Sequence, residues 1–291
     1  MISGATDQLL LDFEAALTLT GRLPRAQPLY AGVDLGTAYT VTAVVNADGA
    51  PVAGALTRSR SAIRDGLVLD YMEAVGILRQ QVKTLREAGF DIRVASAAYP
   101  PGIGDSNARI FANVLNSAHL EVSGLVEEPT AAARVLNIAD GAVVDIGGGT
   151  TGISVLKGGE VVYTADEATG GIHADLVIAG HFKIDTVEAE RIKTDPTRQA
   201  EIFPIIKPVF EKMASIVRRH LKGCPVETIY LVGGTSTFAG IGQVMESETG
   251  LAVEIPFRPL LVTPLGIALN CLDTETGKTA GMKYTGARDD G

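Results

Sequence analysis

The chain has 291 residues, of which 46% are hydrophobic, 20% charged and only 5% aromatic. That length suffices for one large or two modest domains, and an apolar content dominated by Ala, Val, Leu and Ile is typical of buried α/β cores. The net charge of −9 argues against a surface for nucleic-acid phosphates, which requires clustered Lys and Arg. The one basic cluster, Arg58, Arg60 and Arg64, is expected to belong to a solvated loop.

The cysteines and the N-terminus indicate the compartment. Cys224 and Cys271 lack the spacing of metal ligands and fit reduced core thiols. No segment approaches the ~20 apolar residues of a membrane span, and the acidic N-terminus lacks the basic start of a secretory signal. We therefore expect a cytoplasmic protein that has neither a membrane nor a nucleic acid as partner.

The first residues form a segment of their own. Apolar side chains recur at helical spacing over residues 5–20, Gly21 ends the helix, and prolines mark the linker that follows. Either this helix docks on its own domain or it is a peptide that binds another protein. We assign residues 1–29 to the N-terminal helix and linker.

The next part of the chain has the pattern of three strands followed by alternating helices and strands. An apolar strand over residues 31–34 ends in an aspartate, and a turn separates it from an alternating strand over residues 39–45. An Asp-Gly hairpin turn and a third strand follow. Helical spacing over residues 71–88 and 105–118 flanks a buried strand over residues 92–99.

The same pattern then recurs. The segments VDLGTAYTVTAVV and VDIGGGTTGISVL share an apolar strand, an aspartate, a Gly-rich turn and an alternating strand, and each leads into a glycine hairpin. A helix-rich stretch and a late apolar strand complete each half. This duplication predicts an α/β fold of two β-β-β-α-β-α lobes, residues 30–139 and 140–272. The polar tail over residues 273–291 is expected to be disordered.

The two Gly-rich turns have the chemistry of phosphate loops. Small residues let backbone N–H groups converge on a phosphate, and threonine hydroxyls add donors. The aspartates before the turns, Asp34 and Asp145, cannot bond a phosphate directly, but both can hold a hydrated magnesium ion between facing strands. The alternative is two ordinary hairpins with capping aspartates, which the repetition disfavours. The sequence thus predicts a magnesium–nucleotide cleft between the lobes.

One dinucleotide-like motif is rejected. Gly147-x-Gly149-x-x-Gly152 follows a strand, yet the dinucleotide fingerprint needs a helix directly after its turn. Residues 153–156 instead alternate and run into a glycine hairpin. A Rossmann site is therefore not expected.

Three further motifs suit a nucleotide cleft. Gly233 and Gly234 break an apolar strand and would let a flat ring or a ribose pass close to the backbone. Glu190 and Lys193 stand one helical turn apart, which is also the spacing of a plain surface ion pair. Glu128 precedes a proline at the start of an alanine-rich helix, where helix capping is the alternative role.

Together these residues resemble the actin-like ATPase superfamily, which includes DnaK-type chaperones, sugar kinases and the bacterial MreB and FtsA filaments. Residues 32–37 and 145–151 resemble its two phosphate motifs, and residues 232–235 its adenosine motif. Residues 128–132 resemble its connecting helix. The set covers residues 30–272 in the order of the superfamily.

Within that superfamily the chain looks most like the EutJ family of ethanolamine utilisation. This likeness rests on residues 39–40, 64–71, 165–171 and 189–193. Proteins of that family are small, chaperone-like relatives encoded with ethanolamine catabolism and its bacterial microcompartment. The resemblance implies duplicated ribonuclease-H-like lobes of the actin and DnaK type, ATP or ADP with Mg²⁺ as cofactors, and a cytoplasmic location with microcompartment association.

The resemblance also implies roles for single residues. Asp34 and Asp145 would hold magnesium through water, and Glu128 would orient the attacking water for in-line phosphoryl transfer. The residues implied to bind phosphates are Gly36, Thr37, Gly147, Gly148, Gly149 and Thr150. The residues implied to line the rest of the nucleotide pocket are Gly171, Glu190, Lys193, Gly233, Gly234 and Thr235.

Two departures from the superfamily matter. DnaK-type chaperones carry an aspartate, and actins a histidine, at the position of Gly152, so hydrolysis is expected to be slow or absent. Little chain lies between Gly171 and Gly233, so the second-lobe insertion is reduced and part of the adenosine wall and filament surface is expected to be missing. A separate peptide-binding domain after Asp273 is not expected.

Three functions are weighed. The first is a chaperone or assembly factor for ethanolamine-catabolic enzymes or the microcompartment shell, and it would be at most a weak ATPase. The second is a nucleotide-sensing scaffold without turnover, which Gly152 favours. The third, a small-molecule kinase, is disfavoured because the sequence shows no inserted substrate domain. The sequence does not name the protein client.

Overall fold

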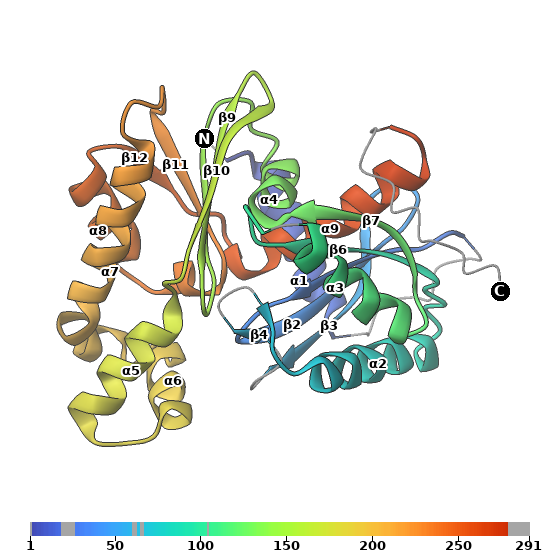
Figure 1. Cartoon of the computed structure of the whole chain (residues 1–291), viewed down its shortest axis with the longest axis horizontal. Helices are drawn as coiled ribbons and strands as arrows, with labels where there is room; N and C mark the ends of the chain where they lie inside the picture. The colour runs from blue at the N-terminus through green and yellow to red at the C-terminus, as the bar shows by residue number, and fades with distance from the viewer. Residues whose placement is uncertain (1, 19–26, 60–62, 65–66, 104, 279–291) are drawn as a thin grey trace.

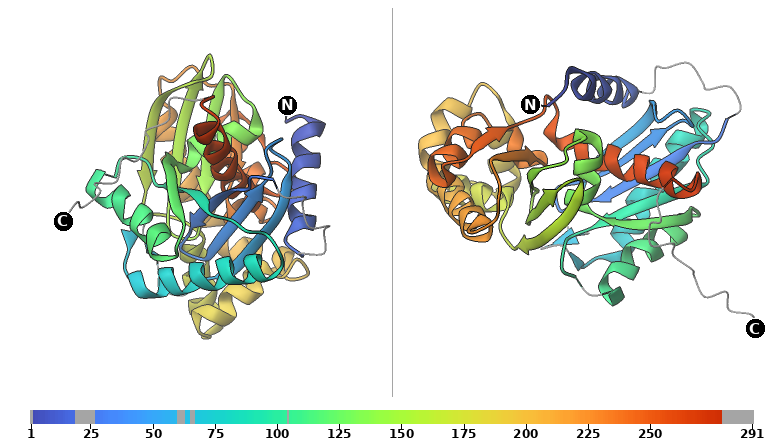
Figure 2. Two further views of the ribbon diagram at one scale, coloured as in Figure 1. Left: turned by 90° about the vertical axis from the view of Figure 1, so that its right-hand side faces the viewer. Right: turned by 90° about the horizontal axis from the view of Figure 1, so that it is seen from above.

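The molecule consists of two lobes, each built on a five-stranded sheet (Figures 1 and 2). The computed structural model describes residues 2–18, 27–59, 63–64, 67–103 and 105–278. The sheets have equivalent strand orders, β3-β2-β1-β6-β7 in the first lobe and β10-β9-β8-β11-β12 in the second. In each sheet the first strand of the lobe pairs antiparallel with the second and parallel with the fourth. The predicted duplication of an α/β lobe is therefore confirmed.

The first lobe packs its helices α2 and α3 on one face of its sheet, around a core that includes Leu78, Leu85 and Phe111. Its strands are β1 Tyr30–Leu35, β2 Tyr39–Val45, β3 Pro51–Arg58, β6 Val94–Tyr99 and β7 Glu121–Glu127, with the small hairpin β4 Ile63–Arg64 and β5 Leu67–Val68. Its helices are α2 Tyr71–Glu87, α3 Asp105–Ser117 and α4 Glu128–Leu136.

The second lobe has its own core, which includes Ile178, Phe210 and Met245. Its strands are β8 Gly141–Ile146, β9 Thr151–Lys157, β10 Glu160–Glu167, β11 Thr228–Val232 and β12 Ala252–Glu254. Its helices are α5 Gly171–Phe182, α6 Thr186–Thr194, α7 Gln199–Leu221, α8 Ile241–Thr249 and α9 Pro259–Glu275. Only helices α5, α6 and α7 lie between β10 and β11, which agrees with the predicted reduced insertion.

Sequence reasoning missed the last strand of each sheet. In β7 the alternation is irregular and Gly124 interrupts it, and β12 is only three residues long. Each of these strands pairs with a longer parallel neighbour, which supplies the order that its own sequence does not encode.

Helices α4 and α9 lie between the lobes and cross each other there (Figure 1). α4 packs on β8 and β9 of the second sheet, whereas α9 packs on β1, β2 and β6 of the first. Two glycines allow these close approaches, since a Cβ at Gly266 would overlap the Ala131 carbonyl and one at Gly32 would overlap the backbone of α9. Each lobe thus contributes a helix to the face of the other.

The N-terminal helix α1, Gly4–Ala16, docks on its own molecule, the first of the two predicted alternatives. Its residues Leu10 and Phe13 are fully buried, and Gly54 in β3 leaves the space that the Phe13 ring fills. Arg258 Nε donates to Glu14 Oε1 at 2.7 Å, so α1 also contacts the second lobe (Figure 2). Part of the predicted linker, residues 19–26, lies outside the described residues.

Residues 273–278, which the sequence assigns to the tail, include the end of a helix. Helix α9 continues to Glu275, and Asp273 is buried because its carboxylate accepts from Arg134 Nε at 2.8 Å. This ion pair joins α9 to α4 and explains why a polar residue remains in the helix. Residues 279–291 lie outside the described residues. Among the described helices, none combines the length and apolarity needed to cross a bilayer.

Candidate functional site

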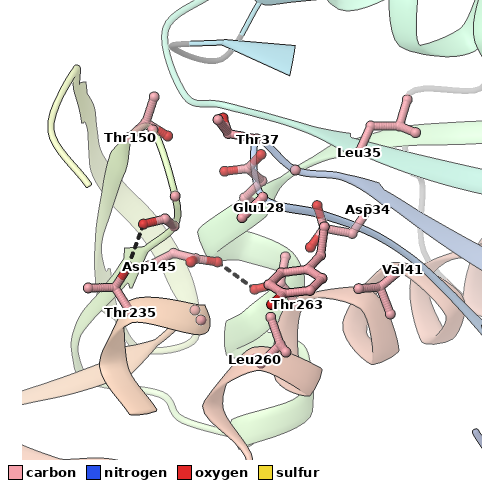
Figure 3. A pocket seen from close by; sticks show the side chains of 18 of the residues that line it. Asp34, Leu35, Thr37, Val41, Glu128, Asp145, Thr150, Thr235, Leu260 and Thr263 are labelled. Carbon is pink, nitrogen blue, oxygen red and sulfur yellow. Dashed lines mark hydrogen bonds between the residues drawn. The ribbon is translucent and has the colours of Figure 1, made fainter. Parts of the chain in front are cut away.

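A pocket opens between the lobes where the two Gly-rich turns face each other (Figure 3). In both turns the glycine after the aspartate strand donates its N–H at 3.0 Å to a carbonyl three residues later, where the next strand starts: Gly36 to Tyr39 and Gly147 to Thr150. A Cβ at Gly148 would lie 3.1 Å from Ala38 Cβ of the opposite lobe. The duplicated hairpins therefore meet across the interface, and their small residues allow it.

The pocket gathers every predicted site residue except Gly171. The residues lining it include Asp34, Gly36, Thr37, Glu128, Asp145, Gly147, Gly148, Gly149, Thr150, Glu190, Lys193, Gly233, Gly234 and Thr235. Gly171 lies behind the second turn, where its N–H donates to the Gly147 carbonyl at 3.0 Å. Thr235 Oγ1 donates to the same carbonyl at 2.7 Å. In this structure these two residues hold the second turn in place.

Three carboxylates converge at the base of the pocket. Asp34 and Asp145 occupy equivalent places near the ends of β1 and β8, and Glu128 begins α4 (Figure 3). Burial and the neighbouring charge of Asp145 raise the pKa of Asp34 to about 7. Burial raises the pKa of Asp145 to about 6. A hydrogen bond of 2.5 Å that Thr263 Oγ1 donates to its carboxylate lowers this pKa and so opposes the effect of burial. Burial and nearby acids hold the pKa of Glu128 well above its usual range.

These raised pKa values fit a cation site. Acids enclosed together resist ionisation unless a positive charge compensates them. Among the described residues, no three His, Cys, Asp or Glu side chains are close enough to ligate a metal directly. Magnesium keeps several of its waters, so carboxylates can also hold it through those waters without direct ligation.

Thr263 was not among the predicted residues. It lies in α9, the helix that crosses between the lobes, and is buried with its hydroxyl on Asp145. Its neighbours in the sequence are apolar, and a lone threonine in an apolar helix is compatible with simple core packing. Only the course of α9 between the two lobes brings it to the aspartate.

Glu190 and Lys193 do not pair with each other, contrary to the surface-pair alternative. Lys193 Nζ lies 2.8 Å from Asp175 Oδ1 and donates to the Gly171 carbonyl at 3.0 Å. Glu190 accepts from Arg58 at the end of β3, across the cleft. Arg58 is exposed, as expected of a solvated residue, but it ends a strand instead of lying in a loop, and the second lobe places a carboxylate within its reach. The Arg60 and Arg64 side chains lie outside the described part of the chain.

We expect Lys193→Met to lower the free energy of unfolding by roughly 3 kcal/mol. Burial lowers the pKa of Lys193 and raises that of Asp175, so for both groups the cost of burying the charge exceeds the attraction between them. Removing only the lysine leaves a buried carboxylate without its cation. The double variant Lys193→Met/Asp175→Leu should regain most of the loss. Urea denaturation of the three proteins tests this, and a double variant as unstable as the single one would contradict it.

The prediction that a strand, and not the helix of a Rossmann site, follows the second Gly-rich turn is confirmed. The strand β9, not a helix, follows the turn, and it pairs with both β8 and β10. Glu128 stands in the first turn of α4 and its side chain lines the pocket, so its position is not that of a helix cap alone.

Comparison with known proteins places this architecture. Residues 133–265 match the model of the type IV pilus assembly protein PilM, and residues 56–195 match that of the MreB/Mbl protein. The structure of MreB5 of Spiroplasma citri bound to AMPPNP is 17% identical, with a TM-score of 0.70 over 88% of this chain and 98% of that chain. A chain of the PilM-PilN type IV pilus biogenesis complex is also 17% identical, with a TM-score of 0.69 over 86% of this chain and 99% of that chain. At such identities the likeness shows the actin-like fold alone.

Closer relatives exist. The ethanolamine utilization protein EutJ of Escherichia coli is 44% identical over 259 residues, 88% of this chain and 91% of that protein. The crystal structure of the protein of that name from Carboxydothermus hydrogenoformans is also 44% identical, with a TM-score of 0.84 over 91% of this chain and 98% of that chain. Identity at this level over nearly the whole length carries the family assignment. The chain therefore belongs to the EutJ family of ethanolamine utilization proteins.

Proposed function

We propose that the chain binds ATP or ADP with Mg²⁺ between its lobes and acts as a chaperone-like or assembly protein of ethanolamine utilization, with slow hydrolysis of ATP. The observation that carries the proposal is the symmetric placement of Asp34 and Asp145, each before a Gly-rich turn that faces the other. Structures of MreB5 with AMPPNP and with ADP have this fold, which supports a nucleotide in the same cleft.

The chain would use its own groups as follows. The two turns would offer backbone N–H groups and threonine hydroxyls to the phosphates, and Asp34 and Asp145 would hold a magnesium ion through its waters. Bound magnesium would supply positive charge to offset that of the phosphates. Glu128 would orient a water at the start of α4. Glu190, Lys193, Gly233 and Gly234 would line the adenosine end of the cleft.

Calorimetry tests the nucleotide site. Wild-type protein should bind ATP–Mg²⁺ at micromolar or lower concentration, and Asp34→Asn or Asp145→Asn should weaken that binding by about 10- to 100-fold. Asp48→Asn is the matched control, because Asp48 is exposed at the tip of the β2–β3 hairpin. Wild-type protein that binds no nucleotide, or aspartate variants that bind like the control, would rule out the proposal.

The output is proposed to be a nucleotide-dependent contact with another protein. The EutJ relatives are ethanolamine utilization proteins, which supports ethanolamine utilization as the setting. The proposed clients are the catabolic enzymes of that pathway or the microcompartment shell. The PilM relative is in a complex with PilN, so this fold does engage protein partners. A nucleotide-sensing scaffold without turnover is the second candidate, which the glycine at position 152 favours. Steady phosphate release above background would exclude the scaffold.

A further inference from the structure

Gly152 has an acidic neighbour, Asp166, that is distant in the sequence but adjacent in the sheet. In the β8–β9 ladder Gly152 lies directly opposite Asp145, and in the β9–β10 ladder it lies directly opposite Asp166. The three residues thus form one row across the second sheet. Strands lie about 4.8 Å apart, so the two aspartates stand about 10 Å from each other with the glycine between them.

All three residues project to the same face of the sheet. Directly opposed residues of antiparallel strands share a face, and successive residues alternate between faces. The alternate positions, including Ile153 and Ala165, pack into the core of the second lobe. The residues of β9 that point to the same face as Gly152, such as Leu156, pack instead against α4 and α9. Asp166 therefore belongs to the face that α4 covers.

The start of α4 lies over this row. A Cβ built at Gly152 would lie 3.2 Å from Pro129 Cγ, and Pro129 directly follows Glu128. Burial raises the pKa of Glu128, and the charges of Asp34, Asp145 and Asp166 raise it further, so two carboxylates of the row lie close enough to act on Glu128. A side chain at position 152 of β9 would have to displace Pro129, whereas Asp166 lies on the neighbouring strand β10.

We propose that Asp166 supplies from β10 the carboxylate that position 152 lacks, and that together with Glu128 it positions the water that attacks the γ-phosphate of ATP. This inference rests on the proposed nucleotide site. In the step, the water oxygen forms a bond to the γ-phosphorus while the bond from that phosphorus to the β–γ bridging oxygen breaks. ADP leaves with the electron pair, and the water proton passes to the carboxylate of Glu128 and then to solvent. Asp166 is a positioning residue here.

The test separates turnover from binding. Asp166→Asn should lower single-turnover hydrolysis by about 10- to 100-fold, while its affinity for ATP–Mg²⁺ and ADP–Mg²⁺ stays within twofold of wild type. Its affinity for ADP–Mg²⁺ with aluminium fluoride, which mimics the transferring phosphoryl group, should fall in parallel with the rate. Asp166→Glu should retain part of the hydrolysis rate and part of the affinity for ADP–Mg²⁺ with aluminium fluoride. Ultrafiltration and calorimetry give the affinities, and thermal melting checks the fold.

Glu167→Gln is the matched control. It removes the adjacent carboxylate of β10, which contacts Arg219 and His220 of α7 on the other face, and it should leave hydrolysis unchanged. Hydrolysis by Asp166→Asn at the rate of wild type, or a wild type that binds ATP without hydrolysing it, would overturn this inference and leave the nucleotide site standing. A wild type that binds no nucleotide would instead overturn the proposed function.

Discussion

Replacing Gly266 by alanine is expected to lower the free energy of unfolding by about 3 kcal/mol or more. The new Cβ would overlap the carbonyl of Ala131 at the crossing of α9 and α4, where backbone lies against backbone and no flexible side chain can yield. The helices would have to separate. Because α4 begins with Glu128 and α9 carries Thr263, the same shift should weaken binding of ATP–Mg²⁺.

Gly76→Ala is the matched control for this prediction. Gly76 also lies inside a helix, α2, but nothing lies within 4 Å of the position that its Cβ would take. There alanine should stabilise the protein by roughly 0.5–1 kcal/mol through its higher helix propensity. Urea denaturation of both variants measures the difference. Equal effects of the two substitutions would show that the crossing of α4 and α9 does not limit the stability of the molecule.

Asp34→Asn is expected to make the nucleotide-free protein more stable while it weakens nucleotide binding. The folded-state pKa of Asp34 is about 7, above its ordinary value of 3.8, so folding disfavours the charged carboxylate. For a carboxyl group with a raised pKa, the stability contribution is lost as pH rises from the unfolded value through the folded one. The increase in the free energy of unfolding that Asp34→Asn brings should therefore be absent near pH 4 and reach roughly 1–4 kcal/mol at pH 8.

Urea denaturation at several pH values, with EDTA and without nucleotide, gives this profile. The stability of wild type should fall between about pH 4 and pH 7 more steeply than that of Asp34→Asn. Asp48→Asn, at an exposed turn, should follow wild type throughout. Adding ATP–Mg²⁺ at pH 8 should stabilise wild type more than Asp34→Asn. A less stable Asp34→Asn at pH 8 would mean that its carboxylate is compensated within the empty cleft.

Local chemistry explains why much of the fold was predictable. The aspartate, the Gly-rich turn and the alternating strand recur in both halves because each hairpin needs small residues at its turn and a periodic apolar face. Reading this repeat was enough to predict two equivalent lobes and to select the residues that line the cleft. The irregular β7 and the short β12 escaped prediction, since their order comes from a neighbouring strand.

The sequence by itself determined the duplicated lobes, the paired turns and the three acids Asp34, Asp145 and Glu128, because each depends on residues close together in the chain. The tertiary structure alone decided what those acids meet. It brought Thr263 to Asp145, separated Glu190 from Lys193 by giving each a different partner, and set Asp166 opposite Gly152. These contacts depend on strand register and on helices that cross between lobes, and neither leaves a periodic signal along the chain.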